Sequence, residues 1–182
     1  MIEYINENFV PLRLNWQASK DILNRYRILW APTVLVLDSN GIEYYSFNGF
    51  LPPDKFIPQL EFGLGKLALK MQDLKKAESQ LKLVVVKYPK SNIAPEAQYW
   101  YGVTEFKITN NVSVEVNAWR KIKENDTDSI WAKNVSGAFS CKKEYLFYAS
   151  FQLITLNGFS VSLYSFSAYN NLSGSLDVII KL

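Results

Sequence analysis

The sequence contains no histidine and only one cysteine, Cys141, among 182 residues. A single cysteine forms neither an internal disulfide nor the dithiol couple of a thiol–disulfide oxidoreductase. Without histidine, the chain also lacks the commonest general base and the commonest zinc ligand, so Cys–His and Ser–His catalytic pairs are excluded. We therefore expect that this chain is not itself an enzyme and that it holds no cofactor and no metal.

The chain also has little excess charge of either sign. The 20 basic and 17 acidic residues give a net charge of +3, and no basic run is interleaved with aromatic residues, so we do not expect nucleic acid as a partner. Residues 1–10 contain acidic side chains and no long apolar stretch, which argues against a signal peptide. The compartment stays unknown, with the cytoplasm as the default expectation.

Apolar and aromatic residues are abundant. Hydrophobic residues make up 48% of the chain, with 5 Trp, 11 Tyr and 11 Phe, which is enough material for a packed core. Their pattern changes twice along the chain. We expect an α/β part over residues 1–64, a helical extension over 65–140 and a β-prone tail over 141–182.

The first part alternates helical and strand patterns. Thr33 to Leu37 is apolar or β-branched throughout, which predicts a strand that is buried on both faces. Asp38-Ser39-Asn40-Gly41 predicts a hairpin turn after it, with Gly41 free to adopt positive φ. The other expected elements are a helix near residues 2–9, a strand over 9–15, a short helix capped by Ser19, a return strand over 42–47 and a helix from about 55 towards 63.

The second part has the spacing of amphipathic helices. Apolar residues from Leu67 to Val85 predict one or two helices, which end at Tyr88-Pro89 because proline disfavours helix at the preceding residue. Further helices are expected after Ser91 and around Trp119 and Trp131. The consecutive aromatics Tyr99, Trp100 and Tyr101 could line a peptide groove, but such spacing more often indicates core.

The tail carries no charged side chain from residue 145 to 176. Asn157-Gly158 lies between two apolar runs and predicts a β-hairpin, with residues 176–182 as a further strand. The alternative is a membrane-spanning helix, but serines and Asn-Gly interrupt the span of ~20 apolar residues that it requires. A selected β-tail and an unselected sequence from a shifted reading frame both fit residues 141–182.

The segment Trp30-Ala31-Pro32-Thr33-Val34 resembles the cis-proline loop of thioredoxin-like proteins. The turn Asp38-Ser39-Asn40-Gly41, the end of the return strand at Gly49-Phe50 and Leu51-Pro52-Pro53 fit the second half of that fold. Later motifs resemble a bacterial subfamily in which such a domain precedes tetratricopeptide-like helices, and the likeness covers roughly residues 1–139. These later motifs are Gly63-Leu64-Gly65-Lys66, Tyr88-Pro89-Lys90-Ser91, Ala94-Pro95-Glu96-Ala97 and Tyr99-Trp100-Tyr101-Gly102-Val103.

The resemblance implies a fold and a site. It implies the C-terminal half of a thioredoxin-like fold, with a cis bond before Pro32 and a loop of Trp30, Ala31, Pro32 and Thr33 that presents backbone to protein or peptide clients. The family's Cys-x-x-Cys would lie upstream of Met1. Two functions therefore stay open: a non-catalytic binding or scaffold protein, or a fragment of a longer thiol–disulfide oxidoreductase.

The same resemblance implies an incomplete sheet. The family's central strand would also lie upstream of Met1 in the sequence. In the sheet, that strand lies between the strands expected at 9–15 and 33–37. An unfilled sheet edge favours self-association. Alternatively, the tail over residues 145–182 covers part of the sheet.

Overall fold

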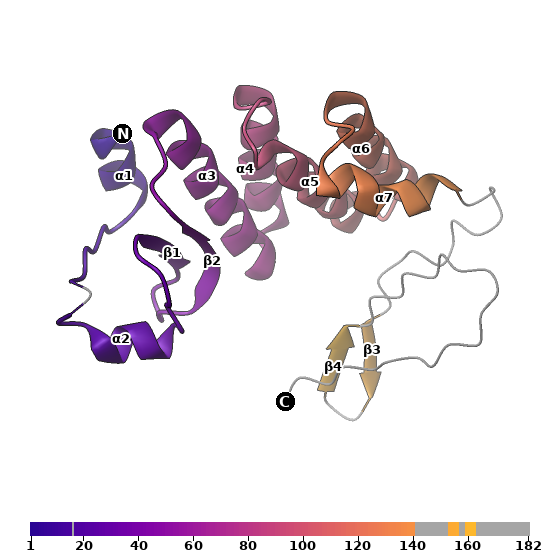
Figure 1. Cartoon of the computed structure of the whole chain (residues 1–182). Coiled ribbons are helices and arrows are strands. Elements are labelled where there is room, and N and C mark those ends of the chain that lie inside the picture. Colours follow the sequence, from indigo (N-terminus) through magenta and orange to yellow (C-terminus); the bar gives the residue numbers. More distant parts are fainter. Residues whose placement is uncertain (16, 141–152, 157–158, 163–182) are drawn as a thin grey trace, which may run out of the picture.

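The computed structural model describes residues 1–15, 17–140, 153–156 and 159–162 of the chain (Figure 1). The described chain is mixed α/β and mostly helical, with a small antiparallel hairpin near the N-terminus. Five helices follow this hairpin in a row, and each packs against its neighbours in the sequence. The α/β class expected from the sequence is confirmed at this level.

The helices and strands follow the expected order closely. They are α1 (Ile2–Asn8), α2 (Lys20–Arg25), β1 (Thr33–Leu37), β2 (Glu43–Asn48), α3 (Pro53–Lys70), α4 (Leu74–Lys87), α5 (Ala94–Thr109), α6 (Val112–Asn125), α7 (Ile130–Ser140), β3 (Leu153–Leu156) and β4 (Phe159–Ser162).

The hairpin of β1 and β2 forms where the sequence predicts it. The strands pair from Thr33 opposite Asn48 to Val36 opposite Tyr45. Gly41 has a φ of +72°, and two turn amides, those of Asn40 and Ile42, donate to the Asp38 side chain. The register shifts after Val36: Val36 lies opposite Tyr45, whereas Leu37 lies opposite Glu43. Strand β2 therefore has one extra residue, Tyr44, at this point.

One face of this hairpin packs on α3. The Tyr45 ring meets Phe62 edge-on, with centroids 5.0 Å apart, and Phe47 meets Phe56 in the same way at 5.3 Å. A Cβ placed on Gly63 would lie 2.8 Å from Cγ2 of Val36, so glycine lets the strand lie directly against the helix. The Tyr45 hydroxyl also donates to the buried Gln59 side chain.

Two expectations for this part are wrong. In β1 only Val36 is buried, at 3% exposure, so the strand is not covered on both faces. Residues 9–15 form no strand. A strand exists only where its backbone groups find partners, and among the described residues β1 pairs with β2 alone. The alternating pattern of this segment therefore has no neighbouring strand to complete it.

The helix after the hairpin is longer than expected. It was expected to run towards Gly63, but α3 continues to Lys70. Glycine at 63 and 65 weakens a helix by propensity alone. Here both positions are close contacts, since a Cβ on Gly65 would lie 2.8 Å from Cδ2 of Leu81 on α4. Packing thus outweighs helix propensity, and one continuous helix spans residues on both sides of residue 64. The domain boundary expected after residue 64 stays a prediction.

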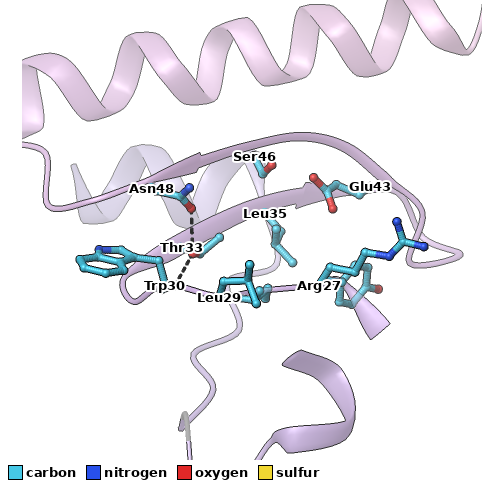
Figure 2. A pocket seen from close by; sticks show the side chains of 10 residues that line it. Arg27, Leu29, Trp30, Thr33, Leu35, Glu43, Ser46 and Asn48 are labelled. Atoms are coloured by element: carbon cyan, nitrogen blue, oxygen red, sulfur yellow. Dashed lines mark hydrogen bonds between the residues drawn. The ribbon is translucent and has the colours of Figure 1, made fainter. Parts of the chain in front are cut away.

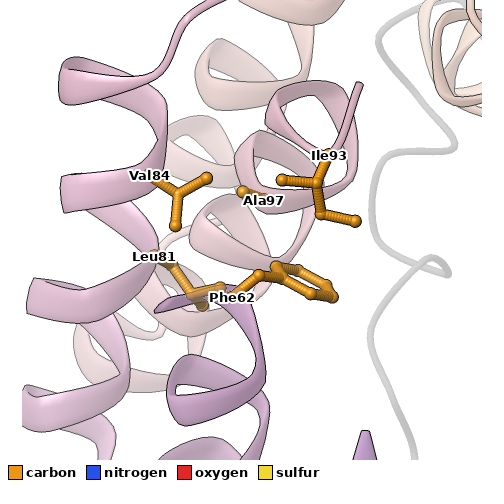
Figure 3. Close-up of a cluster of buried hydrophobic side chains, with 5 residues drawn as sticks. All are labelled: Phe62, Leu81, Val84, Ile93 and Ala97. Carbon is orange, nitrogen blue, oxygen red and sulfur yellow. The ribbon is translucent and has the colours of Figure 1, made fainter. Parts of the chain in front are cut away.

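The main core lies where α3, α4 and α5 meet. Phe62, Leu81, Val84, Ile93 and Ala97 form one buried cluster, and Tyr45 of the hairpin packs against it (Figure 3). The Phe62 ring is fully buried. Burial of a side chain of this size stabilises the fold by roughly 1.5–3 kcal/mol.

Local residue chemistry explains several other helix boundaries, although the expected Ser19 side chain makes no capping hydrogen bond to α2. The Asp73 side chain caps α4 by accepting from the Lys76 amide, and α4 ends before Pro89. The Asn111 side chain caps α6 by accepting from the Ser113 amide, and α5 ends at Thr109, followed by its C-cap Asn110 in a left-handed conformation at φ 52°. The helices expected around Trp119 and Trp131 are α6 and α7.

The tail hairpin is confirmed within the described residues. β3 pairs with β4 in the register that Asn157-Gly158 predicts, from Leu153 opposite Ser162 to Leu156 opposite Phe159. This pair is a separate sheet from β1 and β2. The strand expected over 176–182, residue Cys141 and the rest of the tail lie outside the described residues.

We predict that Gly63→Ala and Val36→Ala are coupled. Gly63→Ala should lower the free energy of unfolding by ~1 kcal/mol, because overpacking outweighs the gain in helix propensity. Val36→Ala alone should cost ~2 kcal/mol of burial. The double variant should be more stable than the sum of the two by roughly 1 kcal/mol in urea unfolding, because Val36→Ala removes the clashing methyl. Simple additivity would contradict this contact.

We also predict that stability falls as pH rises from about 5 to 7, because of Glu115 on α6. This side chain is only 4% exposed, and burial raises its pKa to about 7. The folded chain therefore holds a proton that the unfolded chain releases, and this costs at most a few kcal/mol above pH 7. Glu115→Gln should remove this slope in urea unfolding at several pH values. Glu124→Gln, at an exposed position of the same helix, is the control and should keep it.

Candidate functional site

The loop before β1 has the conformation that the sequence predicts. The Ala31–Pro32 peptide bond is cis. The Pro32 carbonyl accepts a hydrogen bond from the Gly49 amide at 2.8 Å, which ties the loop to the end of β2. The Thr33 hydroxyl lies 2.5 Å from the Trp30 carbonyl and 2.8 Å from the Asn48 side-chain oxygen. The loop is therefore held by three contacts that start or end within it.

A hollow of about 210 Å³ lies beside this loop, on the face of the hairpin that α3 does not cover. Figure 2 shows the hairpin between α3 and the segment that carries Arg27, Leu29 and Trp30. The hollow is lined by Tyr26, Arg27, Ile28, Leu29, Trp30, Thr33, Leu35, Glu43, Ser46 and Asn48.

The four expected client-binding residues do not all reach this hollow. Trp30 and Thr33 line it, whereas Ala31 and Pro32 lie between them in the chain and are exposed. Trp30 is 67% exposed and Leu29 is 89% exposed. Large apolar side chains are seldom left in water without a partner when they gather beside a hollow. The loop therefore offers the apolar side chains of Leu29 and Trp30 beside a hollow that strand residues line from below.

The floor residues were missed by sequence reasoning. Leu35, Ser46 and Asn48 line the hollow together with Thr33. A signal for them exists in the sequence, since side chains two residues apart share a face of a strand. In the observed register Ser46 and Asn48 lie opposite Leu35 and Thr33, and this pairing depends on the extra residue in β2, which the sequence pattern does not reveal.

Charged groups lie at one end of the hollow. Figure 2 places Arg27 and Glu43 at the end away from Trp30. Arg27 has a φ of +51°, a left-handed conformation that turns the chain between α2 and the loop. The hollow thus has an apolar end at Trp30 and a charged end at Arg27, which suits a ligand that is itself amphipathic.

The aromatic residues of α5 form core contacts, as their spacing indicates. Tyr99 stacks on Trp119 with centroids 5.0 Å apart and meets Trp131 at 4.9 Å. Trp100 and Tyr101 pack against the main core. Tyr99, Trp119 and Trp131 thus join α5, α6 and α7, and their rings pack against one another.

A charged cluster between α3 and α5 was not foreseen. The Lys66 ammonium lies 3.4 Å from the centre of the Trp100 ring, and the Trp100 indole donates to Glu96 at 3.3 Å. Burial lowers the pKa of Lys66 to about 8, and the Glu96 carboxylate partly offsets this. The ammonium is therefore engaged by a ring and a carboxylate, which fastens α3 to α5.

Within the described ranges, no three His, Cys, Asp or Glu side chains lie close enough together to share a metal ion. In the same part of the chain, no helix combines the length and the apolar composition needed to span a bilayer.

Comparison with models of protein families, with curated proteins and with solved structures gives no match for this chain.

Proposed function

We propose that this chain is a thioredoxin-like protein that binds an extended segment of a protein client and does not catalyse thiol–disulfide exchange. The proposal rests on one observation: Trp30 is 67% exposed at the rim of a hollow beside the Ala31-Pro32 loop. Aromatic side chains at the edge of a pocket are typical anchors for partner binding.

The shape of the site supports an extended client rather than a small molecule. The hollow lies over the strands, and Thr33 and Leu35 of β1 line it. An extended segment presents alternate side chains to one face. One apolar side chain of the client would enter the hollow beside Leu29 and Trp30, and its polar neighbours would meet Ser46 and Asn48.

The count of cysteines supports the proposal that this chain does not catalyse exchange. Exchange requires an attacking thiolate and a second thiol that resolves the mixed disulfide. The sequence contains one cysteine, Cys141, and no histidine that could lower the pKa of a thiol.

A second candidate is a working thiol–disulfide oxidoreductase of which this chain is a part. The observation that favours it is the uncovered hairpin. Among the described residues, β1 has one paired edge and one open edge, and Leu29 and Trp30 beside it are exposed. An upstream strand that pairs with β1 would cover these groups. Reading the coding DNA upstream of Met1 in frame separates the two candidates, since a Cys-x-x-Cys there favours the enzyme and a stop codon favours the binding protein.

We predict that the purified chain does not accelerate insulin reduction by dithiothreitol. The turbidity of precipitating insulin B chain should rise at the rate of dithiothreitol alone, because a single thiol cannot complete the cycle. A Cys141→Ser variant serves as the control and should behave identically. Catalysis above background that disappears in this variant would rule out the non-catalytic proposal.

We predict that Trp30→Ala weakens client binding. Fluorescein-labelled, S-carboxymethylated insulin B chain serves as an extended apolar probe, and binding is measured by fluorescence anisotropy. Loss of this aromatic anchor should cost about 2 kcal/mol, or roughly 30-fold in Kd.

The matched control is Ile130→Ala on α7, which removes another apolar side chain that is 67% exposed. It should leave Kd within experimental error of the parent chain. No binding of the probe, or equal losses in both variants, would contradict a client site at Trp30.

A further inference from the structure

Helix α4 turns one exposed face away from the core. The helix packs between α3 and α5 (Figure 1) and buries Ala77, Leu81 and Val84. Because an α-helix has 3.6 residues per turn, its exposed residues fall together on the opposite side. We call this side the lysine face of α4, and its members are Lys75, Lys76, Ser79, Lys82, Leu83, Val86 and Lys87.

The charge of the lysine face is of one sign. Four lysines lie on it, whereas the whole chain has a net charge of +3. The one acidic side chain of α4, Glu78, is partly buried on the side of α5, where it lies within hydrogen-bonding reach of Glu105. No carboxylate of α4 therefore neutralises the lysine face.

The folding of α4 does not explain two of these lysines. Lys75 and Lys76 lie in the first turn of the helix, and this turn contains no acidic residue. The helix dipole favours acidic side chains at this end of a helix and disfavours cations. Departures from local preference are expected where function requires them. The lysines of the first turn therefore point to a partner rather than to the stability of the helix.

The cations of this face distinguish between kinds of anionic partner. Specific protein interfaces are enriched in arginine and aromatic side chains and depleted of lysine. On α4 every cationic side chain is a lysine. The face of a single helix is also convex, so it offers no recess that would seat a peptide. A broad anionic surface fits these features better than an acidic protein segment.

The apolar residues of the face favour a lipid surface over a nucleic acid. Leu83 and Val86 lie one helical turn apart, and they are 36% and 70% exposed. A phosphate backbone offers no apolar contact to such side chains, whereas the headgroup region of a bilayer takes up the apolar side chains of a helix that lies on it. Lysine clusters on an amphipathic helix are typical of binding to anionic lipids.

We propose that the lysine face of α4 binds the surface of a membrane that contains anionic phospholipids. The helix lies parallel to this surface, and its four ammonium groups meet the anionic headgroups. Leu83 and Val86 enter the boundary between headgroups and acyl chains. The hollow at Trp30 belongs to other elements of the fold, so this proposal does not depend on a client.

The test is co-sedimentation of the full chain with vesicles of phosphatidylcholine that contain about one third phosphatidylserine. The chain should bind these vesicles and should not bind vesicles of phosphatidylcholine alone. Binding should disappear as salt rises from ~0.1 M to ~1 M, because the Debye length then falls from about 10 Å to about 3 Å. Absence of binding, or equal binding to both kinds of vesicle, would overturn the proposal.

A Lys75→Gln, Lys76→Gln variant separates binding from stability. Each lysine near an anionic surface contributes roughly fivefold, so the partition coefficient should fall by roughly 30-fold. The melting temperature should stay the same or rise, because two cations leave the positive end of the helix dipole. The matched control is Lys121→Gln, Lys133→Gln, which removes the same charge from exposed positions of α6 and α7 and should bind like the parent chain. Equal losses in both variants would contradict a site on α4.

A label on the face reports its contact with lipid directly. In a Val86→Cys, Cys141→Ser chain, the emission of a nitrobenzoxadiazole label at position 86 should shift to shorter wavelength when vesicles are added. The same label in a Ser39→Cys, Cys141→Ser chain lies in the exposed hairpin turn and should not shift. No shift at position 86, or equal shifts at both positions, would overturn the proposal. Equally tight binding of soluble polyglutamate would assign the face to an acidic protein and would also overturn it.

Discussion

Burial of the Phe62 ring is the interaction on which the rest of the described structure depends. On one side Tyr45 meets the ring edge-on at 5.0 Å, and on the other side the ring belongs to the cluster of Leu81, Val84 and Ala97. The hairpin and the helical row therefore share one core through a single helix, α3. The glycines at 63 and 65 serve the same purpose, because each gives up helix propensity for a closer approach of a neighbouring element.

Local signals predict most of this fold. The turn Asp38 to Gly41, the cap at Asp73 and the stop at Pro89 all lie where residue chemistry dictates them. The two failures have a common cause. The strand expected over 9–15 assumed a neighbouring strand, and the double burial expected for β1 assumed a covering layer on both faces of the sheet; a periodic pattern reveals neither partner. The helix end near Gly63 was wrong for a similar reason, since the contacts that hold α3 together come from distant residues.

The site was predictable in part. The sequence singles out Trp30 and Thr33, and both line the hollow, but Leu35, Ser46 and Asn48 become visible only when the hairpin register is applied to the opposite face. The cluster of Lys66, Glu96 and Trp100 could not be foreseen, because it joins helices that are separated by α4 in the sequence. The contacts of Lys66 and Glu96 with Trp100 fasten α3 to α5.

The unbroken course of α3 has a mechanical consequence. Its first half supports the sheet and its second half packs on α4, and the helix is continuous from Pro53 to Lys70, with Pro58 inside it. A force that tilts the hairpin would also tilt α3, and this tilt would compress the close contact between Gly65 and Leu81. Close-packed interfaces resist compression. The packing of α3 on α4 thus helps to hold the hairpin in one orientation relative to the helices that follow it.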